Sequence, residues 1–196
     1  MEIILESKSP RRVELLQQFN IKFRVQVANV PEEQRDSPKQ TAISNASAKA
    51  RAVLELFPKS LIIGADTIVV VDQEILGKPR DREDAAKMLR LLSGRKHHVI
   101  TGVALVTEKV QRTFYEETAV FFRTLADYEI RTYLNTGEPF DKAGAYAIQG
   151  IGGAFVESIS GCYYNVVGLP IPRLLLELRD FGIDVFAYGG VQGGTL

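Results

Sequence analysis

Apolar positions recur along this chain with two periods, one typical of β-strands and one typical of α-helices. Alternating or continuous apolar runs predict strands at residues 3–5, 21–30, 61–71, 75–76, 99–106, 110–122 and 155–159. Apolar residues at helical spacing predict helices at residues 10–19, 38–57, 82–93, 127–136 and 171–181. Because strands alternate with helices but include a hairpin, we expect an α/β fold with a mixed twisted sheet and flanking helices.

The stretch from Gly64 to Pro79 places polar residues in the most apolar part of the sequence. Asp66 and Thr67 lie between apolar residues on both sides, where burying an unpaired carboxylate would cost several kcal/mol. Asp66 is therefore our first candidate for chemistry, as a group that is paired, hydrated or bound to a metal. The return strand brings Lys78 to the same end of the sheet, where an ammonium suits a phosphate. The alternatives are that Asp66 caps a turn and that Lys78 is solvated; the apolar context favours chemistry for Asp66 and leaves Lys78 open.

A second candidate for ligand binding is the segment SPRR at residues 9–12. Ser9 suits the N-cap of the first helix, and a proline follows at the first helical position. Arg11 and Arg12 then lie in the first turn, where positive charge opposes the helix macrodipole. An anion at this helix end would use the free N–H groups and both guanidinium groups, so the segment predicts a phosphate site. A solvated basic turn is the alternative.

Other polar residues carry weaker signals. Glu32 and Glu33 follow a proline in a polar loop, where such residues are usually surface charges. Lys49 lies near the buried face of the Ala-rich helix, and only a nearby anion would make it functional. The glycine-rich segment 141–153 allows a ligand to approach the backbone closely. It is not the dinucleotide fingerprint, because the third glycine of that motif would fall on Phe155.

Composition limits the classes of function. The 196 residues contain 24 Lys plus Arg and 24 Asp plus Glu, so no bulk charge predicts a nucleic-acid or membrane partner. The single cysteine, Cys162, excludes an intramolecular disulfide and a cysteine-rich zinc site. His97 and His98 are expected to be structural or exposed, because two histidines make a histidine-rich metal site unfavourable. The sequence has no signal peptide and no apolar run long enough to cross a bilayer, which predicts a cytoplasmic protein.

Short motifs in a fixed order connect the central segments with the rest of the chain. They are SKSPRR (7–12), GADT (64–67), LGKP (76–79), LSG (92–94), DKAGAY (141–146), IQG (148–150) and NVVGLP (165–170). Each motif alone is weak, but jointly they are highly specific, and from about Ile3 to Ile183 the chain resembles the Maf family of house-cleaning nucleotide pyrophosphatases. The forms of DKAGAY and IQG look like the dTTP/UTP pyrophosphatase branch rather than the 7-methyl-GTP branch.

This resemblance implies an elongated fold with a cleft between two lobes, related to that of the inosine-triphosphate pyrophosphatases. It also implies a homodimer, a divalent metal (Mg²⁺, or Mn²⁺) and hydrolysis of a nucleoside triphosphate to the monophosphate and pyrophosphate. Residues 1–183 would form the catalytic domain, and the glycine-rich residues 184–196 would form a mobile tail.

The resemblance also implies roles for single residues. Asp66 matches the catalytic acid of the family, and Arg12, Thr67 and Gln149 match positions that select the base. The other matching cleft residues are Ser9, Arg11, Glu32, Lys49 and Lys78. The sequence departs from the family twice: Glu6 stands where alanine is usual, and Pro31 stands where an aspartate usually precedes the loop glutamate. The first departure adds negative charge near the expected phosphates, and the second leaves the choice between Glu32 and Glu33 open.

The resulting mechanistic hypothesis is metal-assisted hydrolysis. Asp66 and Glu32 would hold Mg²⁺, and Arg11, Lys49 and Lys78 would stabilise charge on the transferring and leaving groups. Asp66 could instead take the proton of the attacking water, and the sequence does not separate these roles. A nucleotide-binding regulator without turnover, and a Cys162 nucleophile with a distant histidine, are the alternatives from other classes.

Overall fold

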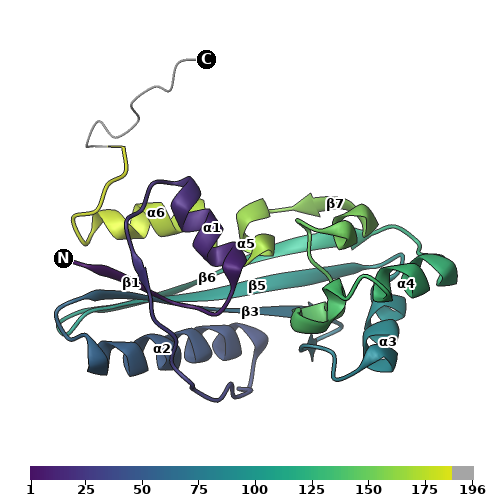
Figure 1. Ribbon diagram of the computed structural model, residues 1–196, viewed down its shortest axis with the longest axis horizontal. Helices are drawn as coiled ribbons and strands as arrows, with labels where there is room; N and C mark the ends of the chain where they lie inside the picture. The colour runs from purple at the N-terminus through teal and green to yellow at the C-terminus, as the bar shows by residue number, and fades with distance from the viewer. Residues whose placement is uncertain (187–196) are drawn as a thin grey trace.

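The computed structural model describes residues 1–186, which fold around a seven-stranded mixed sheet (Figure 1). The strands are β1 (Ile3–Glu6), β2 (Arg24–Val25), β3 (Leu61–Val71), β4 (Glu74–Leu76), β5 (Lys96–Val106), β6 (Gln111–Phe122) and β7 (Val156–Ser160). The α-helices are α1 (Pro10–Gln18), α2 (Pro38–Leu56), α3 (Arg82–Leu92), α4 (Asp127–Leu134), α5 (Tyr163–Val167) and α6 (Ile171–Arg179). Short 3-10 turns lie at Glu138–Asp141, Ala143–Ala145 and Ile151–Phe155. The α/β class with a mixed sheet is thus confirmed.

The sheet is shared by two lobes. Its strand order is β2-β1-β3-β5-β6-β7, with β4 paired to β3. The pairs of β1 with β2 and with β3 are parallel, whereas β3, β5, β6 and β7 pair antiparallel in sequence. In Figure 1 the long strands β3, β5 and β6 run through the molecule, with α1, α2 and α6 around one end and α3 and α4 around the other. The sheet therefore fixes the spacing of the lobes.

Both faces of β3 are buried in the first lobe, which explains its continuous apolar sequence. Ile63 packs with Leu16 of α1 and Leu174 of α6, while Ile62 packs with Ala46 of α2 on the opposite face. Figure 1 shows α2 and the pair α1 and α6 on opposite sides of the sheet. A separate apolar cluster fills the second lobe beneath α3 and α4. Polar residues on β3 between these two cores therefore lie between the lobes.

Two local predictions were wrong. The strand expected at residues 21–30 forms only at Arg24–Val25, because the chain then leaves the backbone ladder and the Ala28 N–H donates to the Glu6 carboxylate instead. Residues 163–167, for which the sequence patterns predict no helix, form the short helix α5. The other predicted helices are present, and the last one ends at Arg179 rather than Phe181.

The predicted tail at 184–196 lies largely outside the described residues, which end at Phe186. Asp184 pairs with Arg179, and Val185 packs against the core of the first lobe. Among residues 1–186, none of the helices combines the length and the apolar character needed to cross a bilayer.

Candidate active site

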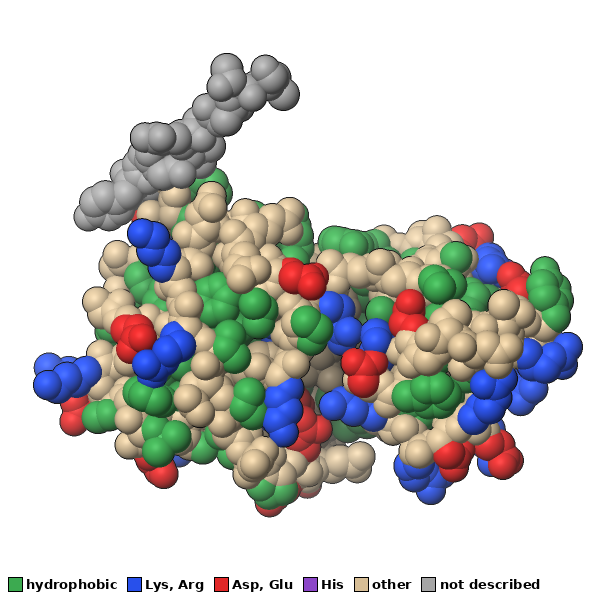
Figure 2. All heavy atoms as spheres, viewed as in Figure 1, with side chains coloured by type: hydrophobic (Ala, Val, Ile, Leu, Met, Phe, Trp, Pro, Cys, Tyr) green, Lys and Arg blue, Asp and Glu red, His purple; other side chains and the backbone are tan. Residues whose placement is uncertain are grey.

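A cleft of about 970 Å³ lies between the two lobes, and Figure 2 shows the surface hollowed there with acidic and basic side chains at its mouth. The structure brings all nine sequence-predicted site residues to the lining of this cleft: Ser9, Arg11, Arg12, Glu32, Lys49, Asp66, Thr67, Lys78 and Gln149. They come from α1, α2, β3 and the loops after β1, β2, β4 and α4. Segments far apart in the sequence thus form a single site.

The charged part of the cleft is organised around the ammonium of Lys49. Its Nζ donates to Asp66 Oδ1 and to Glu32 Oε1, both at 2.6 Å. The Asp66 side chain is only 7% exposed, and its second oxygen, Oδ2, accepts a hydrogen bond of 3.1 Å from Asn45 Nδ2. The costly buried carboxylate that the sequence indicated is therefore paired by a cation and an amide.

Close packing of α2 on the sheet produces this arrangement. A Cβ atom on Gly64 would lie 2.3 Å from the Ala46 carbonyl oxygen, and one on Gly102 would lie 2.3 Å from the Ala42 carbonyl carbon. Any larger residue at either position would move the helix outward. The helix approaches closely enough for Asn45 and Lys49, one turn apart, to reach Asp66.

No sequence pattern used above singles out Asn45. The signal that could have found it is the spacing of Thr41, Asn45 and Lys49, which puts three polar residues on one face of an otherwise Ala-rich buried helix. All three line the cleft.

The charges of this cluster shift one another's pKa values. Burial disfavours the ammonium of Lys49, but attraction to Asp66 and hydrogen bonds to both carboxylates outweigh it, so the pKa of Lys49 is raised. Burial likewise disfavours the carboxylate of Glu32, but its hydrogen bond with Lys49 and the charge of Lys78 lower the pKa of Glu32 below its ordinary value. Both groups are thus held in their charged forms.

The structure separates Glu32 from Glu33. The Glu32 carboxylate faces Lys49, whereas the Glu33 carboxylate pairs with Arg35 at 2.8 Å. The backbone N–H of Glu33 donates to Asn45 Oδ1, which fixes the loop. Glu32 is therefore the loop residue placed beside Asp66.

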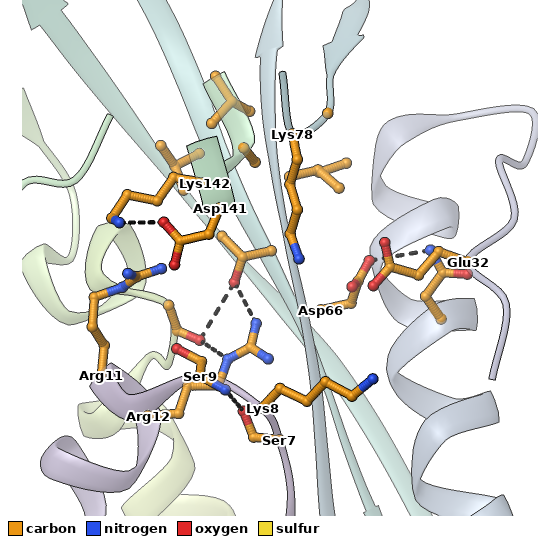
Figure 3. Close-up of a pocket in the computed structure, with 18 of the residues that line it drawn as sticks. Ser7, Lys8, Ser9, Arg11, Arg12, Glu32, Asp66, Lys78, Asp141 and Lys142 are labelled. Atoms are coloured by element: carbon orange, nitrogen blue, oxygen red, sulfur yellow. Dashed lines mark hydrogen bonds and ion pairs between the residues drawn. The ribbon is translucent and has the colours of Figure 1, made fainter. Parts of the chain in front are cut away.

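Further basic side chains line the cleft around the Lys49 cluster. Figure 3 shows Lys78 pointing toward Asp66 and Arg11 pointing toward Asp141, whose partner is Lys142. In the described chain the Ser9 side chain makes no capping hydrogen bond, although Ser9 does occupy the N-cap position of α1. Its backbone N–H instead donates to Ser7 Oγ at 3.0 Å. The Ser9 hydroxyl is thus left to face the cleft.

Arg12 is held differently from Arg11. Its Nε donates to the Gly168 carbonyl at 2.8 Å, Nη1 to the Ala65 carbonyl at 2.9 Å and Nη2 to Thr67 Oγ1 at 2.9 Å. Burial lowers the pKa of Arg12 below its ordinary value, although the charges of Asp66 and Glu6 oppose that effect. These bonds fix the guanidinium against the sheet.

Gln149 is carried by a loop that Glu138 organises. Glu138 accepts hydrogen bonds from the N–H groups of Ile151 and Gly152 and from the Tyr133 hydroxyl, at 2.8 to 3.0 Å. Burial alone would raise the pKa of Glu138, but these donors lower it. The exposed side chain of Gln149 lines the cleft above this loop. Glu138 was missed because its sequence context is that of an ordinary loop glutamate.

Glu6, one of the two departures from the family pattern, lies in the cleft and is only 4% exposed. Its Oε1 accepts a hydrogen bond of 3.2 Å from the Ala28 N–H. Burial raises the pKa of Glu6, and the Ala28 bond, Lys49 and Arg12 only partly offset that shift. The structure thus places an additional carboxyl group beside the charged cluster.

Cys162 and His97 are not part of the cleft lining within residues 1–186. Cys162 precedes α5 and is outside the cleft lining of residues 1–186, which argues against a nucleophilic role. His97 is fully buried in β5 and bonds the Tyr146 hydroxyl at 2.8 Å. Burial lowers the pKa of His97 to about 4. A structural role for His97 fits this environment.

The residues that could hold a hard cation are the carboxylates of Glu32 and Asp66. Glu32 and Asp66 both contact Lys49 Nζ, so their oxygens converge on one point that already holds a positive charge. Within residues 1–186 no group of three or more His, Cys, Asp or Glu could hold a metal ion. Mg²⁺ commonly binds one or two carboxylates together with substrate phosphates and water, so two suffice.

Comparison with known proteins identifies the family of this chain. Residues 2–181 match the Maf-like protein family. The chain belongs to the Maf family. A Maf-family relative from Symbiobacterium thermophilum, named dTTP/UTP pyrophosphatase, is 52% identical over 190 residues, covering 96% of this chain and 98% of the relative. Relatives with the same name from Geobacillus sp. and Bacillus cereus are 48% and 50% identical, covering 92% and 94% of this chain and 98% and 97% of the relatives.

Among solved structures, this Maf-family chain is similar to the Staphylococcus aureus Ham1 protein. The TM-score is 0.46 at 15% sequence identity, covering 62% of this chain and 72% of the other.

Proposed function

We propose that this chain is a nucleoside triphosphate pyrophosphatase that hydrolyses dTTP and UTP to the monophosphate and pyrophosphate. One observation carries the proposal: a buried carboxylate, Asp66, is held by Lys49 and Asn45 in a cleft that also collects Arg11 and Lys78. Phosphoryl chemistry needs such a combination of oxygen ligands and positive charge. Relatives that match nearly the whole chain at about half identity carry the name of this activity.

The basic residues would bind the triphosphate. Arg11 and Lys78 present cationic donors to the cleft (Figure 3), and the Ser9 hydroxyl adds a neutral donor at the start of α1. Lys49 offsets part of the negative charge of Asp66 and Glu32, which lowers the repulsion between these carboxylates and an anionic substrate. These residues position the phosphates and stabilise charge that develops on the leaving group.

A divalent cation, Mg²⁺ or Mn²⁺, is part of the proposal, with Asp66 and Glu32 as its protein ligands. When bound, it supplies neutralisation of phosphate oxygens and lowers the pKa of water. Each oxygen of Asp66 accepts one hydrogen bond within the described structure. Each therefore retains a lone pair for a ligand or for the proton of a water molecule.

The base would lie at the other end of the cleft, beside Arg12, Thr67 and Gln149. Uracil and thymine present two carbonyl acceptors around one N–H donor, which the donors and acceptors of these three side chains can match.

We propose that the enzyme works as a homodimer in the cytoplasm. Light scattering coupled to size-exclusion chromatography tests whether it is a dimer. The alternatives are a 7-methyl-GTP pyrophosphatase and a binding protein without turnover. An assay of pyrophosphate release separates both from the proposed activity.

The test is a panel of nucleoside triphosphates, including CTP, purine triphosphates and 7-methyl-GTP, assayed for pyrophosphate release by the purified protein. We expect dTTP and UTP to give the highest kcat/KM, with release abolished by excess chelator and restored by Mg²⁺. Full turnover in chelator would reject the metal. Tight binding without turnover would favour the regulator, and preference for 7-methyl-GTP would overturn the substrate assignment.

A further inference from the structure

A series of hydrogen-bonded hydroxyl groups runs from Thr67, in the lining of the cleft, into the sheet. Thr67 on β3 and Thr101 on β5 are directly opposite in the strand register, and their Oγ1 atoms are 2.9 Å apart. Thr101 is fully buried, and its hydroxyl donates to the Asn165 carbonyl at 3.2 Å. Neither Thr101 nor Asn165 is among the residues proposed to contact the phosphates or the base.

We propose that Thr101 is a positioning residue that fixes the direction of the Thr67 hydroxyl hydrogen, so that Thr67 presents only an acceptor to the substrate base. This inference rests on the proposed function, because it requires a pyrimidine nucleotide in the cleft. Thr101 would thus determine specificity without touching the substrate.

The donors and acceptors along this series of hydroxyl groups support the direction in which Thr67 donates to Thr101. Thr67 Oγ1 accepts from Arg12 Nη2, which can only donate. If Thr67 then donates to Thr101 and Thr101 donates to Asn165, every hydroxyl hydrogen lies in a contact of 3.2 Å or less. The reverse direction would remove the bond from Thr101 to the Asn165 carbonyl and would turn the Thr67 hydrogen either into the cleft or, across 3.4 Å, toward the Gly168 carbonyl. That carbonyl already accepts a shorter bond of 2.8 Å from Arg12 Nε.

The consequence is that one acceptor and one donor face the base in a fixed arrangement. Among the described contacts, Thr67 keeps one lone pair for the cleft, and the Arg12 guanidinium beside it has N–H groups beyond the three that bond to protein. An acceptor next to a donor complements the N–H and carbonyl of uracil or thymine. Cytosine presents the opposite pair, a ring-nitrogen acceptor and an amino donor, so both contacts would be mismatched.

Thr118 provides a matched control for Thr101. Thr118 on β6 is also a fully buried threonine, and its Oγ1 accepts from Asn165 Nδ2 at 3.0 Å. It donates to the Cys162 carbonyl at 3.1 Å. Thr118 therefore shares the Asn165 neighbourhood with Thr101 but makes no hydrogen bond to Thr67 in the described structure.

The experiment compares kcat/KM for UTP, dTTP and CTP among wild type, Thr101→Val, Thr101→Ser and Thr118→Val. In Thr101→Val the Thr67 hydrogen can turn into the cleft and meet the cytosine ring nitrogen. We expect kcat/KM for CTP to rise and the UTP-to-CTP ratio to fall about tenfold. Thr101→Ser and Thr118→Val should keep the wild-type ratio within about twofold, because both keep the Thr67 contact.

A rise for CTP distinguishes this role from simple damage to the fold, which would lower all substrates together. Thermal unfolding of each variant confirms that the compared proteins are folded. An unchanged ratio in Thr101→Val, or an equal change in Thr118→Val, would overturn the inference.

Binding separates failure of this inference from failure of the proposed function. Calorimetric titration of UTP and CTP into the same proteins in chelator needs no turnover. If wild type binds UTP but releases no pyrophosphate, the proposed activity is wrong, and the ratio of dissociation constants decides the role of Thr101. If wild type binds UTP and CTP equally, the fixed acceptor confers no selection and the inference is wrong.

Discussion

The two ends of the cleft use different chemistry. One end is ionic: Lys49 stands between Glu32 and Asp66, with Glu6 and Lys78 close by. The other end is a hydrogen-bonded network in which two backbone carbonyls and the Thr67 hydroxyl hold a single guanidinium, that of Arg12, and the buried Thr101 hydroxyl lies behind Thr67. The ionic end can exchange its internal pairings for phosphate and metal, whereas the other end has directions fixed by burial.

This difference suggests a division of labour within one site. Charges that rearrange around a ligand suit the stabilisation of developing negative charge. Fixed donors and acceptors suit discrimination between bases, because a mismatched group in a dry site stays unpaired. Substitutions at the ionic end should therefore change the rate for every nucleotide, and substitutions at the other end should change the preference among them.

The largest effect is expected for Asp66→Asn, which keeps the size of the side chain but removes its charge. We expect kcat to fall at least about a hundredfold with dTTP and UTP, the scale typical of a lost general base or electrostatic group. Asp72→Asn is the matched control, since Asp72 lies in the turn after β3 with a side chain that is 73% exposed. Near-normal turnover in a folded Asp66→Asn protein would remove this residue from the reaction.

Lys49→Met tests the role of the ammonium group that lies between Glu32 and Asp66. It leaves two carboxylates facing each other, so we expect at least about a tenfold lower kcat/KM and a lower melting temperature at pH 7. The raised pKa of Lys49 means that its pairing stabilises the fold below pH 10.5 and is lost only as the pH rises through the folded-state pKa. Adding Mg²⁺ should restore part of the lost stability. Lys59→Met, at an exposed turn after α2, serves as the control.

Gln149→Ala tests the other end of the cleft. The amide of Gln149 can donate and accept, and its removal should reduce the UTP-to-CTP ratio of kcat/KM about tenfold with little change in kcat for UTP. A kinetic panel with UTP, dTTP, CTP and 7-methyl-GTP measures this. If the preference were unchanged, Gln149 would not read the base.

The smallest effect is expected for Glu6→Gln. Removing a negative charge near the phosphates should lower KM for UTP a few-fold, measured by steady-state kinetics. A higher KM would instead assign Glu6 to ligand or metal binding.

Glu6 also predicts a pH dependence of stability. Burial raises its pKa above 4.5, so the folded protein binds this proton more tightly than the unfolded chain. Stability is then lost as the pH rises from 4.5 through the folded-state pKa. The melting temperature of Glu6→Gln minus that of wild type should therefore increase between pH 4 and pH 7. A constant difference would contradict the raised pKa of Glu6.

Sequence patterns predicted the elements and the carboxylate but not their contacts. The polar interruption of an apolar strand was enough to identify Asp66, because its burial is costly whatever the fold. Its partner Asn45, and the network from Thr67 to Thr101, depend on helix packing and on the register between β3 and β5. Register is set by the whole sheet, so no local pattern could have revealed it.

Loops were predicted least well. The choice between Glu32 and Glu33 depended on where the loop after β2 is fixed, and Asn45 on α2 provides that contact. The strand expected through residue 30 is shortened because the Glu6 side chain replaces a backbone acceptor. In each case a side chain distant in sequence decides the local conformation.

The most direct test of the division of labour is the UTP-to-CTP ratio of kcat/KM for Asp66→Asn, measured by pyrophosphate release alongside wild type. If the ionic end acts on the phosphates alone, both substrates lose the same factor and the ratio stays within about threefold of wild type. If the ratio instead falls to near one, Asp66 takes part in reading the base, and the two ends of the cleft do not have separate roles.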